Sequence, residues 1–299
     1  MRIALTANPR SGGGLDPEPL ADAMRRHGAT VEVYGCETAE LERLRHDAPD
    51  RVAVAGGDGT LATAAEAAGA LDVPLAVIAT GTANDFARAN DLPDDPEAAA
   101  ELAATGQATR RLELGVLADG RPFVNTASAG LASHAARHAA PFKLILGPFA
   151  YALGALAAAV LDSPLRCRVR VDGEEVFEGG AWQLIVGVTG AFGAGSELGA
   201  ADPADGVLDI AVLPAGSRLA LARRAWGLRR GTIAEQAPVE HHRGRVIEVS
   251  LPPGTELNVD GELRDAGLER VSVRPGAYAL VVPGDAATST PSRPRRLTS

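Results

Sequence analysis

A glycine-rich loop with a single carboxylate, Gly56-Gly57-Asp58-Gly59-Thr60, stands between an apolar run and an alanine-rich stretch. The pattern predicts a strand, a tight loop and a helix N-terminus, where backbone N–H groups and the helix dipole favour a phosphate. Glycines let the main chain approach a ligand, and Thr60 is a candidate helix cap. The loop is not a Walker loop, because the GxxxxGK[ST] spacing is absent and the only lysine, Lys143, lies far along the chain. We therefore expect amides, arginines and Mg²⁺ to meet the charge of a nucleotide, with Asp58 engaging the metal.

Two further glycine-bearing loops follow apolar runs in the same way, at residues 8–14 and 80–85. Four of their polar side chains can hydrogen-bond a ribose or a phosphate: Asn8, Ser11, Thr82 and Asn84. Asp85 is placed to cap a helix that begins at Phe86. Each loop alone has an ordinary alternative, because Gly, Asn, Asp and Thr are common in turns between strands and helices. Three such loops at successive strand ends favour one shared ligand site.

The elements before these loops must bring them together. Short apolar runs alternate with helical patterns up to about Glu113, which predicts a mostly parallel sheet with crossover helices and a ligand beyond the carboxyl ends of its strands. The expected strands are 3–7, 31–34, 52–55 and 75–79, and the expected helices are 20–27, 39–45, 61–70 and 96–105.

From about Leu112 the pattern changes to β-strands separated by turn signals. The expected strands are 121–126, 165–171, 182–188, 208–213, 246–251, 256–259, 270–273 and 278–282, with two helical insertions between them. This series is typical of an antiparallel sandwich or barrel. The tail from Gly284 has the composition of a disordered segment.

An acidic turn in this second half is a candidate cation site. In Ala201-Asp202-Pro203-Ala204-Asp205-Gly206-Val207-Leu208-Asp209, carboxylates three residues apart can share one hard cation through oxygen ligands. A solvated acidic turn is the alternative.

The stretch Val259-Asp260-Gly261-Glu262 is a candidate for proton abstraction, because a carboxylate can accept the proton of a hydroxyl that attacks a phosphate. The chain holds a second copy of this pattern, Val171-Asp172-Gly173-Glu174. Asp-Gly between strands makes a good hairpin turn, and that interpretation suffices for the second copy. Without further context it would suffice for the first copy as well.

Composition limits the class of protein. The chain has 299 residues, 46% of them apolar, which suits a folded protein of one large or two smaller domains. Its net charge of −9 gives no reason to expect nucleic-acid binding. Two cysteines, Cys36 and Cys167, suit a reducing cytosol, and the N-terminus enters a strand pattern without a signal peptide. We expect a cytoplasmic protein.

The three loops together resemble the signatures of a known family. Gly56–Thr60, Asn8-Pro9-Arg10-Ser11-Gly12 and Gly81-Thr82-Ala83-Asn84-Asp85-Phe86-Ala87-Arg88 are similar to those of the diacylglycerol kinase catalytic-domain family, and the likeness runs over about residues 2 to 283. The family includes bacterial lipid kinases and sphingosine and ceramide kinases, and NAD kinases are distant relatives. The third stretch separates lipid kinases from NAD kinases.

The resemblance implies ATP and Mg²⁺ as cofactors. It places the ATP site on all three loops, at Asn8, Pro9, Ser11, Gly56, Gly57, Gly59, Thr60, Gly81, Thr82, Asn84 and Asp85. It implies Glu262 as the general base and Asp58 as the second catalytic residue.

The resemblance also gives the acidic turn a role. It implies that Asp202, Asp205 and the carbonyl of Val207 hold a structural Mg²⁺. Glu113 stands where the family usually has Asp, and we expect it to join the acidic network that links Asp58 to the metal.

Two stretches bear on membrane contact. Residues 144–161 are uncharged over the length of a membrane span, but Pro148 and many alanines keep them modestly hydrophobic. We expect a helix that lines an apolar acyl-chain cleft or that packs between the domains. Ser217–Arg230 combines arginines with Trp226, which suits either an anionic bilayer surface or an ordinary surface helix.

These inferences combine into one expected architecture. We expect an α/β nucleotide-binding domain over residues 1–115, like that of NAD kinases and diacylglycerol kinases. An antiparallel β-sandwich lipid-binding domain follows over 116–283, whose last strand can return to the first domain, and then a flexible tail over 284–299.

The expected function is an ATP-dependent lipid kinase that phosphorylates diacylglycerol or a related lipid. The acceptor stands at a membrane surface, with peripheral contact on its inner face, and homodimerisation is left open. The alternatives are a sphingoid-base, ceramide-type or other lipid kinase, a less favoured NAD kinase, and a catalytically silent nucleotide- or lipid-binding regulator.

Overall fold

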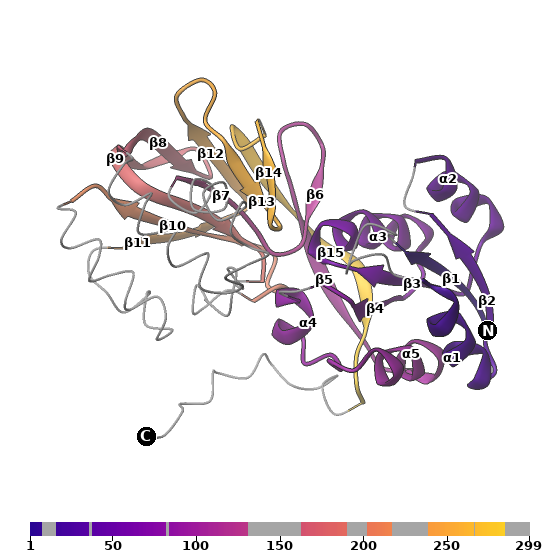
Figure 1. The fold of residues 1–299 in the computed structure, drawn as a ribbon. Coiled ribbons are helices and arrows are strands. Elements are labelled where there is room, and N and C mark those ends of the chain that lie inside the picture. The colour runs from indigo at the N-terminus through magenta and orange to yellow at the C-terminus, as the bar shows by residue number, and fades with distance from the viewer. Residues whose placement is uncertain are drawn as a thin grey trace, which may run out of the picture. The chain divides into compact units, whose positions relative to one another are not determined.

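The computed structural model describes residues 1–7, 16–35, 38–81, 84–130, 163–189, 202–216, 239–265 and 267–284 (Figure 1). The chain divides into two compact units, one formed by Met1–Glu113 with Gly276–Ser299 and the other by Leu114–Pro275. The division falls inside two strands, β5 (Thr109–Val116) and β15 (Arg270–Val281), so each of these strands belongs to both units.

The first unit is built on a parallel sheet. Its strands, besides parts of β5 and β15, are β1 (Arg2–Ala7), β2 (Thr30–Tyr34), β3 (Arg51–Gly56) and β4 (Leu75–Ala79). Their order is β2-β1-β3-β4-β15, and each neighbouring pair runs parallel. The expected α/β class is confirmed, and the C-terminal part of β15 joins this sheet through Leu280 beside Leu75.

Helices cover both faces of the parallel sheet. They are α1 (Glu18–Arg26), α2 (Thr38–Asp47), α3 (Asp58–Leu71), α4 (Asp85–Ala89) and α5 (Pro96–Thr105). Alternate residues of β1, namely Ile3, Leu5 and Ala7, share one core with α1 and α5. α3 packs closely on β15, because a Cβ at Gly69 would lie 2.1 Å from the carbonyl oxygen of Ala277.

A buried arginine ties β3 to the end of α5. Arg51 is 4% exposed, and its guanidinium donates to the carbonyl oxygens of Ala103 (2.5 Å) and Gly106 (2.6 Å). Burial lowers the pKa of this guanidinium, while the negative end of the α5 dipole favours its charge.

Arg51→Met is expected to lower the free energy of unfolding by about 2–4 kcal/mol, because the buried Ala103 carbonyl and the partly buried Gly106 carbonyl lose a charged donor. Urea unfolding of this variant beside Arg26→Met measures the effect. Arg26 forms an exposed ion pair with Glu97, so its loss is expected to cost under about 1 kcal/mol. Equal costs for the two variants would contradict the structural role of Arg51.

The second unit is antiparallel. Besides parts of β5 and β15, its strands are β6 (Pro122–Phe123), β7 (Thr126–Gly130), β8 (Leu165–Val171), β9 (Glu174–Gly187), β10 (Leu208–Pro214), β11 (Glu240–Gly244), β12 (Val246–Ser250), β13 (Leu257–Val259) and β14 (Glu262–Arg264). The order is β14-β13-β7-β9-β8-β12-β15, and β10 pairs with both β9 and β11. One hydrophobic core joins these strands, with Val169, Val186 and Ile247 among its most buried residues.

Several element boundaries differ from those the sequence predicts. β9 is longer than the expected 182–188, and the expected strands 270–273 and 278–282 are one continuous strand, β15. The expected strand 121–126 is instead divided between β6 and β7. β11 was not predicted because it is polar, and β14 was not predicted because it is short. β5 was not predicted either.

Neither of the expected helical insertions, 144–161 and 217–230, lies in the described residues. Among the helices that the structure describes, none is both long and apolar enough to cross a membrane.

Candidate active site

The glycine-rich loop leads directly from β3 into α3. Helix α3 begins at Asp58, and its N-cap is Gly57 in an extended conformation (φ −93°, ψ 179°). Thr60 lies inside the first turn, where its N–H donates to the Gly57 carbonyl at 3.1 Å. The prediction that Thr60 caps the helix is therefore wrong. A helix that starts on glycine has no capping side chain at that position, which suits an anion at its N-terminus.

The loop after β4 lies against the glycine-rich loop. The Thr80 N–H donates to the Gly56 carbonyl at 3.1 Å, and the Phe86 N–H reaches the Asp58 carboxylate at 3.5 Å. A Cβ built on Gly81 would lie 3.2 Å from the Gly57 Cα. Two of the three predicted loops therefore meet backbone to backbone at the ends of adjacent parallel strands.

Helix α4 begins one residue earlier than the sequence predicts, at Asp85 instead of Phe86. Asn84 is the N-cap, in the left-handed conformation (φ 51°, ψ 38°), and Asp85 is already the first helical residue. The Asp85 carboxylate is nearly buried and pairs with Arg88 at 2.6 Å. The prediction that Asp85 caps a helix beginning at Phe86 is wrong, and its carboxylate instead fixes the first turn of α4.

The structure does not test the remaining predicted residues of the nucleotide site and its acidic network. Asn8, Pro9, Ser11 and Thr82 lie outside the described residues. Glu113 is on β5 and is 1% exposed. Its expected part in an acidic network with Asp58 stays a prediction.

The acidic turn precedes β10 in the second unit. The Asp202 carboxylate accepts the Ala204 N–H at 3.1 Å, and the Asp205 carboxylate accepts the Val207 N–H at 3.1 Å. Arg243 on β11 also pairs with the other oxygen of Asp205. Across the part of the chain that the structure describes, no group of three or more His, Cys, Asp and Glu side chains has the arrangement of a metal site.

A buried carboxylate, that of Asp209, follows this turn in the sequence. Asp209 is 1% exposed, with His241 Nε2 at 2.7 Å and Arg243 Nε at 3.4 Å from its Oδ1. Arg243 thus contacts both Asp205 and Asp209.

The acidic turn at residues 202–207 offers carboxylate and carbonyl oxygens, which are hard donors that suit Mg²⁺. These residues therefore fit a cation once Arg243 releases Asp205.

Glu262 follows the turn of the β13–β14 hairpin. Val259 pairs with Glu262 across the hairpin, and Asp260 (φ 46°) and Gly261 (φ 87°) form its turn. The expected Asp-Gly hairpin is present here and also at Asp172-Gly173 (φ 50° and 90°). The Glu262 side chain is 55% exposed and pairs with Arg264 at 2.7 Å.

The acidic turn and the Glu262 hairpin occupy one row of the antiparallel sheet. Asp209 pairs with Gly187, Gly187 pairs with Thr126, and the Thr126 carbonyl accepts the Asp260 N–H at 2.9 Å. Three strand spacings of about 4.8 Å separate Asp209 from Asp260 along this row, roughly 14 Å in all. The fold therefore brings both acidic sites to one region of the second unit.

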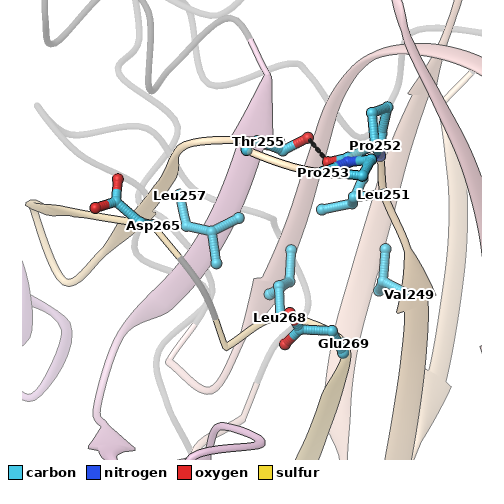
Figure 2. A pocket seen from close by; sticks show the side chains of 10 residues that line it. Val249, Leu251, Pro252, Pro253, Thr255, Leu257, Asp265, Leu268 and Glu269 are labelled. Carbon is cyan, nitrogen blue, oxygen red and sulfur yellow. Dashed lines mark hydrogen bonds between the residues drawn. The ribbon is translucent and has the colours of Figure 1, made fainter.

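A small pocket opens at the far end of the same hairpin, near Leu257 and Asp265. Figure 2 shows its lining, which includes Leu251 and Leu268 and a hydrogen bond from the Thr255 hydroxyl to the Pro252 carbonyl at 2.6 Å. Its volume of about 100 Å³ is below the roughly 300 Å³ at which small-molecule pockets begin, so it does not suit a lipid chain.

Family models and solved structures agree with this arrangement. The model of the diacylglycerol kinase catalytic domain matches residues 2–116, and that of the YegS C-terminal NAD kinase beta sandwich-like domain matches residues 125–282. The crystal structure of a diacylglycerol kinase from Bacillus anthracis has a TM-score of 0.74 at 20% identity, covering 95% of this chain and 98% of that one. An NAD kinase from Archaeoglobus fulgidus in complex with ATP has a TM-score of 0.50 at 16% identity, covering 94% and 93%.

The fold is therefore the one shared by diacylglycerol kinases and NAD kinases, as the sequence predicts. A diacylglycerol kinase of Staphylococcus aureus is 30% identical over 277 residues, which cover 87% of this chain and 86% of that protein. The chain belongs to the diacylglycerol kinase family.

Sequence reasoning missed the residues that hold these sites in place. Arg243 and His241 lie on a strand without an apolar pattern, and their partner Asp209 is 32 or more positions away. Asp260 was assigned only to a turn, although its carboxylate binds a distant segment. No local signal marks these contacts.

Proposed function

We propose that this protein transfers the γ-phosphate of Mg·ATP to the hydroxyl of diacylglycerol or a related lipid, giving a phospholipid such as phosphatidic acid. The observation that carries the proposal is the direct contact of the Gly56–Thr60 and Gly81–Asp85 loops at the N-terminus of α3, in a chain of the diacylglycerol kinase family. Backbone amides at a helix N-terminus are well suited to the phosphates of a nucleotide.

Catalysis in this proposal is mainly positioning and charge neutralisation. Asp58 engages the metal of the bound nucleotide, and the loop amides hold its phosphates. Glu262 accepts the proton of the lipid hydroxyl and directs its oxygen at the γ-phosphorus. The remaining nucleotide contacts are assigned to Asn8, Pro9, Ser11, Thr82 and Asn84.

The two loops must lie close together for nucleotide binding. A valine at Gly81 would bring its Cβ to 3.2 Å from the Gly57 Cα and 3.0 Å from the Asn84 Oδ1, and its methyl groups closer still. Gly81→Val is expected to weaken ATP binding at least about 10-fold in calorimetric titration, because small displacements at a positioned site are costly. Gly284→Val is the control, since a Cβ there meets nothing within 4 Å. Unchanged ATP affinity in Gly81→Val would contradict the assigned site.

We also assign a structural Mg²⁺ to Asp202, Asp205 and the carbonyl of Val207. This cation would supply positive charge to a turn in which Arg243 now contacts Asp205. Because guanidinium and cation compete for that carboxylate, Arg243→Ala is expected to enlarge the rise in melting temperature that Mg²⁺ produces. A Mg²⁺-induced rise that is unchanged in Asp202→Asn and Asp205→Asn would show that the cation binds elsewhere.

The lipid reaches the enzyme at a membrane surface. We propose peripheral contact at the inner face of the membrane, with Ser217–Arg230 as its predicted site, outside the described residues. Binding of the triple variant Arg223→Ala, Arg224→Ala, Trp226→Ala to anionic liposomes tests this assignment by sedimentation. Full binding by that variant would reject it.

The acceptor is identified by its product. Wild-type protein, Mg·ATP and mixed micelles of diacylglycerol, sphingosine or ceramide, with NAD as a soluble acceptor, are analysed by mass spectrometry. The proposal predicts phosphatidic acid from diacylglycerol. Phosphorylated sphingosine or ceramide alone would assign the sphingolipid class, and ATP binding without any product would favour a silent regulator.

A further inference from the structure

The carboxylate of Asp260, two residues before the proposed base, is held by several backbone hydrogen bonds. It accepts three consecutive backbone N–H groups, from Val124 at 2.8 Å, Asn125 at 2.9 Å and Thr126 at 3.0 Å. These donors lie more than 130 positions earlier in the sequence, in the connection between β6 and β7 (Val124 and Asn125) and at the first residue of β7 (Thr126). Hydrogen bonds to an ionised acceptor are about twice as strong as neutral ones. Asp260 therefore fastens its hairpin to that connection.

The connection that Asp260 binds is itself firmly held. Val124, Asn125 and Thr126 are between 0% and 7% exposed. The Asn125 carbonyl accepts the Val188 N–H at 2.8 Å, and its side-chain oxygen accepts the Thr189 hydroxyl at 2.9 Å. The hairpin is thus attached to a buried, multiply bonded part of the second unit.

Glu262 lies on the short hairpin that Asp260 attaches. Its own side chain is 55% exposed, so its own packing does little to hold it. It follows Asp260 by two residues, and both hairpin strands at this end are only three residues long. The backbone of the turn is further fixed by the Gly261 N–H, which donates to the Asn258 side chain at 3.0 Å. Movement at Asp260 is therefore passed directly to Glu262.

We propose that Asp260 is a positioning residue for Glu262, which it holds in place by binding the backbone of residues 124–126. This inference rests on the proposed function, in which Glu262 is the base. A base must stand within hydrogen-bond reach of the proton it takes, so a loosened hairpin lowers the rate of transfer and leaves nucleotide binding intact.

The chain supplies its own matched control. Asp172 occupies the same turn of the β8–β9 hairpin, and its carboxylate accepts the N–H groups of Arg245 at 3.0 Å and Val246 at 2.9 Å. The residue that corresponds to Glu262 there is Glu174, which has no proposed role. Asp172→Asn therefore weakens the same kind of backbone attachment, by removing the charge and one acceptor oxygen, without touching the proposed base.

The test compares Asp260→Asn with Asp172→Asn in steady-state assays of phosphate transfer to diacylglycerol. Asp260→Asn is expected to lower kcat about 10- to 100-fold with KM for ATP unchanged. Asp172→Asn is expected to lower the melting temperature by a similar amount and to keep kcat within about 2-fold of wild type. Wild-type kcat in folded Asp260→Asn would overturn the inference.

A double variant separates positioning from a general loss of structure. If Asp260 acts through Glu262, then Asp260→Asn in a Glu262→Gln background causes little further loss of kcat, because the base is already gone. Multiplicative losses would overturn the inference. Should Asp260→Asn fail to fold, Asn258→Ala removes one bond of the same turn, and the same criterion applies to it.

The kinetics of the two variants distinguish a failure of the proposed function from a failure of the role assigned to Asp260. Full activity in Glu262→Gln, or wild-type protein without transfer, overturns the proposed function and the inference with it. A slow Glu262→Gln beside a fully active Asp260→Asn overturns the inference alone.

Discussion

Glu262→Gln is expected to lower kcat for phosphate transfer by about 10²- to 10⁴-fold, the range that a positioned general base contributes. Glutamine keeps the size and hydrogen-bonding oxygen of the side chain but cannot accept the proton of the lipid hydroxyl. Because the Glu262 side chain is 55% exposed and its ion pair is with the nearby Arg264, the melting temperature is expected to change little. The measurement is steady-state kinetics with saturating Mg·ATP and diacylglycerol in micelles.

Glu174→Gln is the matched control for this prediction. Glu174 occupies the same place after an Asp-Gly turn in the β8–β9 hairpin and is exposed. Its replacement is expected to leave kcat unchanged. Equal activity of Glu262→Gln and wild type would remove Glu262 as the base, and equal losses in both variants would point to a general effect of acidic hairpin residues.

Asp58→Ala is expected to reduce kcat by at least about 10²-fold, because it removes the carboxylate assigned to the nucleotide's metal from a site preorganised for charge. The same change removes the 3.5 Å contact with the Phe86 N–H that links the two loops. Asp58→Asn keeps an oxygen for that contact and loses only the charge. Comparing the two variants in kinetics and in ATP titration divides the effect between the metal and the loop contact.

Glu97→Ala controls for the loss of an acidic residue in the first unit. Glu97 is exposed and pairs with Arg26 on α1. Its kcat is expected to equal that of wild type. An Asp58→Ala variant that also keeps the wild-type kcat would contradict the role of the glycine-rich loop in phosphate binding.

The parallel half of the fold is predictable from local sequence. The runs 75–79 and 96–105 coincide with β4 and α5 because each is apolar and ends at glycine, proline or a polar residue. The loop at Gly56–Thr60 follows for the same reason, since its glycines stop a strand and its neighbours favour a helix. These signals lie within a few residues of the structures they produce.

The antiparallel half depends on pairing between distant segments, so its boundaries are less predictable. β11 contains His241, His242 and Arg243 and has no apolar alternation, yet it pairs with β10 along its length. β15 passes through Pro275 and Gly276, which divide it into two strands in a local interpretation. Both are strands because their neighbours supply the hydrogen bonds.

The same limit applies to the candidate site. Gly57 and Gly81 meet only because β3 and β4 are adjacent and parallel, which the alternating pattern predicts. The attachment of Asp260 to residues 124–126 requires that β13 pair with β7. No local sequence pattern predicts that pairing. The residue types therefore predict the chemistry of the site. The contacts that hold its acidic side chains in place could be found only from the structure.

We propose that this chain is a lipid kinase in which the carboxylates of Asp58 and Glu262 act in one reaction. The most direct measurement is the transfer of radiolabelled γ-phosphate from Mg·ATP to diacylglycerol in mixed micelles, by wild type, Asp58→Ala and Glu262→Gln side by side. Labelled phosphatidic acid from wild type and almost none from either variant is the predicted result. Equal labelling by all three proteins, or none by wild type, would contradict the claim.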